Sequence, residues 1–457
     1  MPFTAVFDEK FCRENAPSDC TIIIFGSSGN LAEKKIFPAL DALEKRGLLH
    51  PSSRIVALSR RKFKLEELLA KIRVSPALAR KISVLQFDPD DPDSAERLDE
   101  HLRKIEPSNG KNGRIFYFAV PTVFSGSIIK LLHRGGLLNE PSKTAFRNVA
   151  LEKPLGENKA DINRMYRFLS SLLEPHQIYL VDHYLGKDDV QNILMLRFAN
   201  RIFSGIWNNS CIEKLTIGVS ERHGIGGRGA YFDRTGIIRD MFQSHLLLML
   251  GLCIMARPDE FDVEHIHRNL NSAIESIRVE KVRFAGQYEG YLQEQSVAAN
   301  SGTLTCADIC CRSTFPGWHG VKMRLFAGKA MAQERTVIRA SFRGEKLPFA
   351  DIPDAVLPGN ELELELKPDS GIKLQICCKK NGPLLCLGTL SLSHTAGKQI
   401  SGDGYWRILL ACQNCDRTFF PDIRMLENAG AVCDEAEKML SPENVRIYSR
   451  GTLDFSA

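Results

Sequence analysis

The chain has 457 residues, of which 44% are hydrophobic and 25% are charged, the composition of an ordinary globular protein long enough for two or more domains. A formal net charge of +5 is too small to indicate nucleic-acid binding. The longest apolar run, HLLLMLGLCIMA from His245, is too short to cross a bilayer, and the start MPFTAVFDEKF lacks the basic and apolar regions of a secretory signal. We therefore expect a cytoplasmic protein that binds neither membranes nor nucleic acid.

Residues 21–180 alternate short apolar segments with helical patterns. The apolar segments are TIIIF, RIVALS, ISVLQF, RIFYFAV, RNVALEKP and QIYLVD, at 21–25, 54–59, 82–87, 114–120, 147–154 and 177–182. Strands that alternate with helices indicate βαβ units and a parallel sheet. The sequence therefore predicts an α/β first domain, of the Rossmann-like type, over residues 1–181.

The first of these segments is followed by a glycine turn and the start of a helix, in FGSSGNLAEKK. Gly26 permits a tight turn, Gly29 lets the backbone approach a pyrophosphate, and Ala32 allows the helix to pack closely on the strand. The spacing GxxGxxA is a weak pattern, and an ordinary strand–helix turn is the alternative. We expect a dinucleotide site whose contacts come from this turn and helix, at Gly26, Ser27, Ser28, Gly29, Asn30 and Leu31.

The end of the second strand indicates which dinucleotide is bound. Proteins that bind NAD commonly carry a carboxylate there, whereas this chain has Ser59, Arg60 and Arg61. A guanidinium binds a 2′-phosphate bidentately, and a carboxylate would repel it. NADP is therefore the expected cofactor, with Arg60 as its phosphate ligand; a solvated basic turn is the alternative.

The pattern changes beyond residue 182. A helix at 188–200 is followed by EKLTIGVSE (213–221) and by a strongly apolar helix at 237–256. The strand-like segments after residue 276 are RVEKVRFAGQY, TLTCADICCRSTF, VKMRLFAG, TVIRASFR, ELELELK and IKLQICC. This order is typical of an α+β domain with a large, mainly antiparallel sheet and helices on one side, predicted over residues 182–457.

Thirteen cysteines are present. The adjacent pairs Cys310-Cys311 and Cys377-Cys378 lie in apolar, strand-like segments, where cysteine behaves as a small buried hydrophobe. Cys412 and Cys415 form a lone CxxC, and the sequence has no matching second pair of zinc ligands. We expect reduced, structural cysteines and no metal site.

Polar side chains follow several of the predicted strands. The segment IYLVDHYLGK ends a strand on Asp182, His183 and Tyr184, with Lys187 three residues further on. A polar strand end entering a helix is the plain explanation, but these four side chains together can form a cationic pocket backed by an acid. Further titratable groups at strand ends or on the apolar helix are Lys153, Glu221, Asp240, His245 and Lys329.

These segments resemble the glucose-6-phosphate dehydrogenase family. The motif DHYLGK is complete at 182–187, and EKP, VQNILMLRFANRIFSGIWN and GRGAYFDRTGIIRD are also similar to that family, in the same order. The resemblance is dense from 21 to 345 and thin beyond. It implies NADP-linked oxidation of glucose 6-phosphate at C1 to 6-phosphogluconolactone, a homodimer or a dimer of dimers, and a role in the oxidative pentose phosphate pathway.

The resemblance also implies a role for each candidate residue. His245 matches the general base, a task suited to a group that titrates near neutrality, and Asp182 matches the carboxylate that orients it. The remaining positions fall into three groups: phosphate ligands His183, Tyr184 and Lys187; ligands of the sugar, Lys153, Glu221, Asp240 and Lys329; and Lys35 and Lys153, where cofactor and substrate meet. In an α-helix, Asp240 and His245 would lie about 140° apart and point in different directions.

Some positions depart from the family pattern. Asn30 replaces the usual Asp but can still cap the helix. Ser244 replaces Asn, Lys367 replaces Gln, and Phe326 replaces an arginine whose charge Arg324, on the same strand face, can partly supply. Glu365 replaces the arginine of a second, structural NADP site, so we expect that site to be absent. Two alternatives to the main hypothesis remain: a dehydrogenase for another sugar phosphate, and a catalytically weak paralogue that only binds nucleotide.

Overall fold

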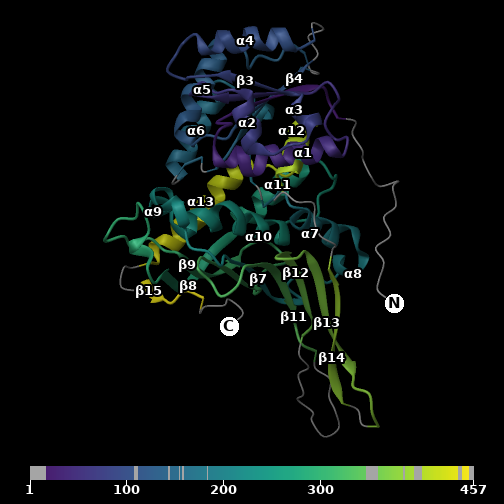
Figure 1. Cartoon of the computed structure of the whole chain (residues 1–457). Coiled ribbons are helices and arrows are strands. Elements are labelled where there is room, and N and C mark those ends of the chain that lie inside the picture. Colours follow the sequence, from purple (N-terminus) through teal and green to yellow (C-terminus); the bar gives the residue numbers. More distant parts are fainter. Residues whose placement is uncertain are drawn as a thin grey trace. The chain divides into compact units, whose positions relative to one another are not determined.

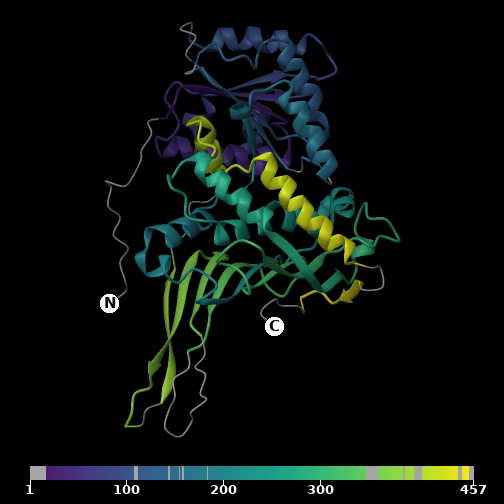
Figure 2. The same ribbon diagram turned by 180° about the vertical axis from the view of Figure 1, so that it is seen from behind.

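The computed structural model describes residues 17–107, 112–142, 145–153, 155–156, 159–182, 184–345, 359–383, 386–395, 404–440 and 445–451. The chain packs as two compact units, drawn from opposite sides in Figures 1 and 2. The first unit comprises Met1–Gly156, Ala160–Lys187 and Ile400–Ile423, and the second comprises Glu157–Lys159, Asp188–Gln399 and Arg424–Ala457. Three features differ from the predicted division: the first unit continues to Lys187, a late segment of the chain returns to it, and Glu157–Lys159 is assigned to the second unit.

The first unit is built on a six-stranded sheet in the order β3-β2-β1-β4-β5-β6, with every pair parallel. The strands are β1 (Cys20–Phe25), β2 (Arg54–Ser59), β3 (Ile82–Gln86), β4 (Gly113–Phe118), β5 (Arg147–Leu151) and β6 (Ile178–Leu180). All six were predicted, because strands covered on both faces are continuous apolar runs. The strand order reverses between β1 and β4, and a crevice for a dinucleotide forms at the carboxyl ends of such strands.

Helices connect these strands. They are η2 (Ala32–Ile36), α1 (Phe37–Lys45), α2 (Leu65–Ile72), α3 (Pro76–Ala79), α4 (Ser94–Ile105), α5 (Thr122–Arg134), α6 (Lys159–Ser170) and η3 (Pro175–Gln177). The segment that returns to this unit contains α12 (Tyr405–Gln413), whose Tyr405, Ile408 and Cys412 pack into the same hydrophobic core as β1. The Asn148 side-chain amide, on β5, donates to the Cys412 carbonyl at 2.6 Å. This helix was not predicted.

The second unit contains a nine-stranded sheet in the order β14-β13-β12-β11-β7-β10-β9-β8-β15. The strands are β7 (Ile212–Ser220), β8 (Ile277–Tyr288), β9 (Cys306–Ser313), β10 (Lys322–Gly328), β11 (Arg335–Phe342), β12 (Glu361–Lys367), β13 (Gly371–Lys379), β14 (Leu387–Thr395) and β15 (Val445–Tyr448). The prediction of a mainly antiparallel sheet is confirmed, since among the described strands of this sheet only β7–β10 and β8–β15 pair in parallel. Strands β14 and β15 were not predicted.

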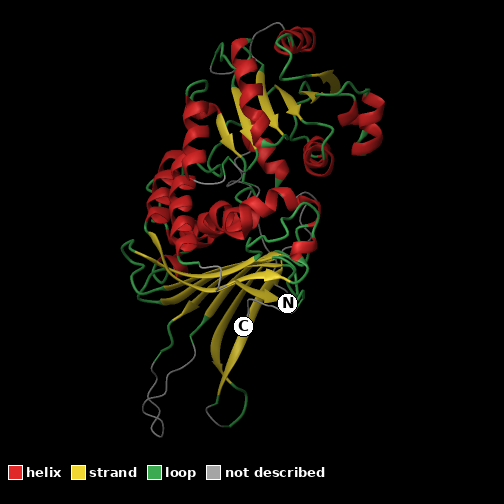
Figure 3. Ribbon diagram, turned by 90° about the vertical axis from the view of Figure 1, so that its left-hand side faces the viewer, coloured by secondary structure: helices red, strands yellow, loops and turns green. Residues whose placement is uncertain are grey.

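Figure 3 shows the helices of this unit packed on one face of its sheet. They are α7 (Asp188–Ala199), α8 (Arg201–Ser204), η4 (Gly226–Arg228), α9 (Gly229–Ile237), η5 (Ile238–Leu246), α10 (Leu247–Ile254), α11 (Val263–Glu275), η6 (Tyr291–Gln293) and α13 (Ile423–Lys438). The helical run from Gly226 to Ile254 is long and apolar enough to cross a membrane, but 89% of its apolar window is buried inside the protein. It is the core helix of this unit.

Candidate active site

The glycine turn after β1 is held by the end of β2. The amides of Gly26 and Ser27 both donate to the Leu58 carbonyl, at 3.1 and 3.0 Å, and the Gly29 amide donates to the Gly26 carbonyl at 3.0 Å. Gly26 has φ +78°, and a Cβ there would lie 2.6 Å from the Ala119 carbonyl oxygen. Only glycine fits this position, so the turn brings backbone, rather than side chains, to the crevice between β1 and β4.

The helix after this turn begins as a π-helix, η2, and carries Lys35 at its half-buried face. Ala32 is fully buried against the core, as the close packing of helix on strand requires. The predicted Asn30 cap is not formed: the side chain is exposed, and Asn30 caps no amide among the described residues because it already lies in the first helical turn. The first amides of the helix have no intrahelical partners and are therefore available to phosphate oxygens.

Arg60 lies directly after β2, as predicted, and meets two carboxylates from the loop after β3. Its Nη2 lies 2.6 Å from Asp90 Oδ2, and its Nε lies 3.3 Å from Asp88 Oδ1. These acids were not predicted from the sequence. The carboxyl ends of neighbouring parallel strands lie side by side, so the FDPDD segment after β3 was the available signal.

The ends of β5 and β6 bring Lys153 and Asp182 together. The Lys153 ammonium lies 3.0 Å from Asp182 Oδ2, and Asp182 Oδ1 accepts the backbone amides of Tyr184 and Leu185 at 2.8 and 3.2 Å. The side chain of Asp182 is only 1% exposed, so the ion pair and both amides stabilise its charge. The Lys187 ammonium lies 4.0 Å above the centre of the Tyr184 ring. His183 lies outside the described residues.

Glu152 is a titratable group of this strand end to which sequence analysis assigned no role. The Tyr117 hydroxyl, on β4, donates to Glu152 Oε1 at 2.5 Å. Burial is the main cause that raises the pKa of Glu152 to about 7; the Tyr117 hydrogen bond and Lys153 oppose it, and the charge of Asp182 adds to it. This carboxyl group therefore titrates near neutrality, directly before Lys153 in the chain.

In the second unit, Glu221 and Lys329 come together because β7 and β10 are parallel and end in register. Ser220 pairs with Gly328, and the Glu221 amide donates to the Gly328 carbonyl at 2.8 Å. The Lys329 ammonium forms an ion pair with Glu221 and lies 3.4 Å from Asp240 Oδ2. Lys329 is fully buried, whereas the Glu221 side chain is 34% exposed, so the carboxylates are the more accessible members of the cluster.

Asp240 and His245 lie on η5, where the helix is a π-helix. The expectation that they point in different directions is wrong, because it assumed α-helical geometry. A π-helix forms hydrogen bonds between residues five apart, so such residues lie about one turn apart on the same side. His245 is buried, at 4% exposure.

Two aromatic residues of α9 complete this cluster and were not identified from the sequence. The Tyr231 hydroxyl lies 3.5 Å from Asp240 Oδ1, and the centre of the Phe232 ring lies 5.0 Å from the Lys329 ammonium. Burial, followed by the charge of Asp240, raises the pKa of Tyr231, which keeps its hydroxyl protonated. Both residues lie within the recognised motif GRGAYFDRTGIIRD, so the signal was present, but no role was assigned to either aromatic side chain.

The residues that depart from the family pattern have their own partners. Arg324 Nε lies 3.1 Å from Asp308 Oδ1, so its charge is engaged on the sheet, while Phe326 is buried. Lys367 forms a 3.0 Å ion pair with Glu334, and Glu365 accepts from Arg335 Nε at 3.1 Å. The Ser244 hydroxyl donates to the Arg239 carbonyl at 3.4 Å. These contacts do not test the expected absence of a second NADP site, which stays a prediction.

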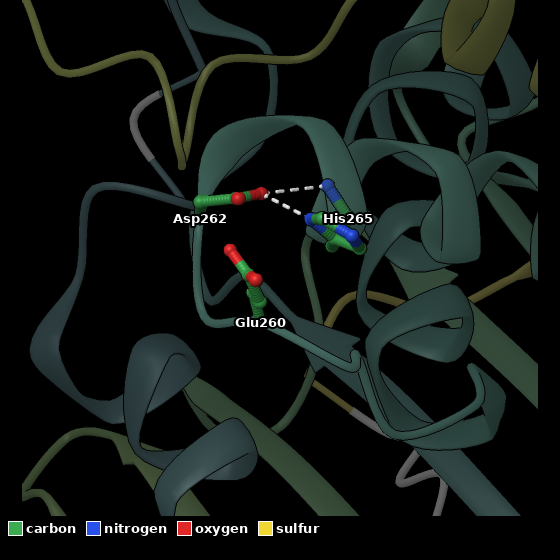
Figure 4. Close-up of side chains that lie close together, drawn as sticks. All are labelled: Glu260, Asp262 and His265. Carbon is green, nitrogen blue, oxygen red and sulfur yellow. Dashed lines mark hydrogen bonds and ion pairs between the residues drawn. The ribbon is translucent and has the colours of Figure 1, made fainter.

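One group of possible metal ligands lies at the start of α11 (Figure 4). Asp262 Oδ1 accepts the His265 amide at 2.8 Å and lies 2.8 Å from His265 Nδ1, while Glu260 is exposed beside them. The pKa of Asp262 is lowered chiefly by the His265 amide. Asp262 thus acts as the N-cap of the helix, which accounts for the arrangement without an ion. No metal site is assigned.

The cysteines of the CxxC are free thiols. Cys412 is fully buried in the core of the first unit, and burial raises the pKa of its thiol. Burial also raises the pKa of Cys415. Neither cysteine has the lowered thiol pKa of a reactive group, in agreement with the expected structural role.

Comparison with known proteins identifies the family. The model of the glucose-6-phosphate dehydrogenase NAD-binding domain matches residues 23–192, and that of the C-terminal domain matches residues 194–456. The cytoplasmic glucose-6-phosphate 1-dehydrogenase 5 of Arabidopsis thaliana is 34% identical over 82% of this chain and 77% of its own length, and the Dickeya dadantii enzyme is 32% identical over 86% and 85%. A solved glucose-6-phosphate dehydrogenase in complex with glucose 6-phosphate has a TM-score of 0.87 and 26% identity over 96% of both chains. The chain therefore belongs to the glucose-6-phosphate dehydrogenase family.

Proposed function

We propose that this protein oxidises glucose 6-phosphate at C1 to 6-phosphogluconolactone, with NADP as the hydride acceptor, as the entry step of the oxidative pentose phosphate pathway. The observation that carries the proposal is the cluster of the second unit, where Asp240 and His245 lie one π-helical turn apart and Asp240 meets the Lys329–Glu221 pair. A buried histidine on the same helix as a carboxylate that can accept sugar hydroxyls is suited to proton removal from a sugar.

The first unit fits the proposed cofactor. Its strand order reverses at β1 and β4, and the glycine turn at this point leaves no space for a Cβ at Gly26. When bound, NADP supplies the nicotinamide that accepts the hydride. In our proposal the turn from Gly26 to Leu31 holds the pyrophosphate, Arg60 holds the 2′-phosphate, and Lys35 and Lys153 border the nicotinamide side.

The side chains of the protein accept the proton of the C1 hydroxyl and stabilise the positive charge that this creates. His245 removes the proton of the C1 hydroxyl and becomes an imidazolium. Asp182, whose charge is stabilised by Lys153 and by two backbone amides, is proposed as the carboxylate that orients the imidazolium. Glu221, Asp240, Lys329 and Lys153 position the sugar hydroxyls.

The substrate phosphate is assigned to His183, Tyr184 and Lys187. A dianion is stabilised by cations and hydrogen-bond donors, and the cation–π contact of Lys187 with Tyr184 orders that ammonium before the ligand binds. The proposed division of labour places the dinucleotide on the first unit and the catalytic histidine on the second. We further propose a cytoplasmic location, by analogy with relatives such as the cytoplasmic Arabidopsis thaliana protein, and the homodimer or dimer of dimers that the family resemblance implies.

The direct test is the increase in absorbance at 340 nm when the full chain is mixed with glucose 6-phosphate and NADP. Parallel reactions contain NAD in place of NADP, or the phosphates of galactose, mannose or fructose. Rapid turnover with glucose 6-phosphate supports the proposal. Turnover of another sugar phosphate alone would reject it and assign specificity to Ser244, Phe326 and Lys367; NADP binding with no turnover of any substrate would indicate the non-catalytic paralogue.

A further inference from the structure

Two carboxylates bind one edge of the Arg60 guanidinium. Asp88 lies against Nε and Asp90 against Nη2, the two donors that together form one bidentate edge of the fork. A phosphate that binds this edge must displace both carboxylates. Arg60 and Asp90 are solvent-exposed, with 60% and 71% of their side chains accessible, so either side chain can turn away at small cost.

The two acids differ in what else they do. Asp88 Oδ1 also accepts the Asp90 amide at 3.1 Å, so Asp88 helps to shape the loop after β3. Within the described part of the chain, the Asp90 carboxylate is bonded to Arg60 alone. Asp90 is therefore a second charge beside the predicted 2′-phosphate site that the fold of the loop does not require.

We propose that Asp90 is a specificity-determining residue that lowers the preference of this enzyme for NADP over NAD. With NADP, the 2′-phosphate competes with Asp90 for Arg60 and is repelled by its charge. With NAD, Arg60 stays paired, and the carboxylate accepts a hydrogen bond from the 2′-hydroxyl of the ribose, the role that an acid after the second strand has in NAD-binding proteins. The proposal rests on the assignment of the dinucleotide site under the proposed function.

Isothermal titration of the full chain with NADP and with NAD, without sugar phosphate, tests this inference. Asp90→Asn should tighten NADP binding by about 3- to 10-fold, the effect of one charge removed about 6 Å from a dianion in a water-like dielectric. NAD binding should stay the same or weaken by a few-fold. The matched control is Asp99→Asn, which removes the same charge and an ion pair with the exposed Arg103 from α4 of the same unit.

The measured quantity is the ratio of the two dissociation constants. The control should leave this ratio within about twofold of wild type. A ratio that Asp90→Asn does not change would overturn the proposal, and so would weaker NADP binding, which would mean that Asp90 holds Arg60 in its binding orientation. Because the titration needs no turnover, it is independent of the activity assay: failure of catalysis rejects the proposed reaction, whereas an unchanged ratio rejects the role of Asp90.

Discussion

Glu152→Gln should make the stability of this protein depend less on pH. In the wild type, Glu152 directly follows β5, and its carboxyl group accepts a hydrogen bond from the Tyr117 hydroxyl. Burial raises the pKa of this carboxyl group to about 7, compared with 4.5 in the unfolded chain. A glutamine keeps the shape and the acceptor oxygen but cannot ionise. The stabilities of the variant and the wild type should therefore diverge at the pH values at which Glu152 would ionise.

The sign follows from proton binding. Between pH 4.5 and 7 the folded wild type retains a proton that the unfolded chain has lost, so the stabilisation present below pH 4.5 is lost as the pH rises through 7. The corresponding loss is about 0.8 kcal/mol at pH 5 and about 3 kcal/mol at pH 8, from about 1.4 kcal/mol per unit of pKa difference. Compared with wild type, Glu152→Gln should thus gain on the order of 2 kcal/mol between these two pH values.

The assay is urea unfolding from pH 5 to pH 8.5, with the difference in free energy of unfolding between variant and wild type plotted against pH. Glu100→Gln, at an exposed position of α4 in the same unit, is the control and should follow the wild type. A difference that does not change with pH would refute the raised pKa. A variant that loses stability relative to wild type at high pH would show that ionised Glu152 is stabilised, with Lys153 as the nearest cation.

Three further substitutions test the site assignments. His245→Asn should lower kcat by at least about 10³-fold and change the KM for sugar phosphate by only a few-fold, and a variant with a tenth of wild-type activity would exclude His245 as the base. Arg60→Ala should raise the KM for NADP far more than that for NAD, and equal effects would mean that Arg60 does not bind the 2′-phosphate. Gly26→Ala should weaken NADP binding by about tenfold or more, because its Cβ would lie 2.6 Å from the Ala119 carbonyl oxygen. Gly47→Ala is the control: Gly47 also has a positive φ, but a Cβ there has no atom within 4 Å, so NADP affinity in the same titration should be retained.

The amino-acid sequence was enough to predict the six-stranded sheet of the first unit and most of the candidate residues. Most of its strands are near-continuous apolar runs because a parallel sheet is covered on both faces, and the carboxyl ends of parallel strands meet at one edge. The amino-acid pattern alone therefore places Lys153 and Asp182 at the ends of strands in one sheet. The DHYLGK motif is equally local, since its residues follow one another at a single strand end.

Features that depend on contacts between residues far apart in the chain could be seen only in the three-dimensional structure. The return of α12 to the first unit rests on the packing of Tyr405 and Ile408 into a core formed by strands near the start of the chain, which no local pattern reports. The Arg60–Asp90 pair likewise forms between two strand ends. Asp240 and His245 lie on the same side only because this stretch forms hydrogen bonds as a π-helix, a choice imposed by packing around it and invisible in a pattern that both helix types satisfy.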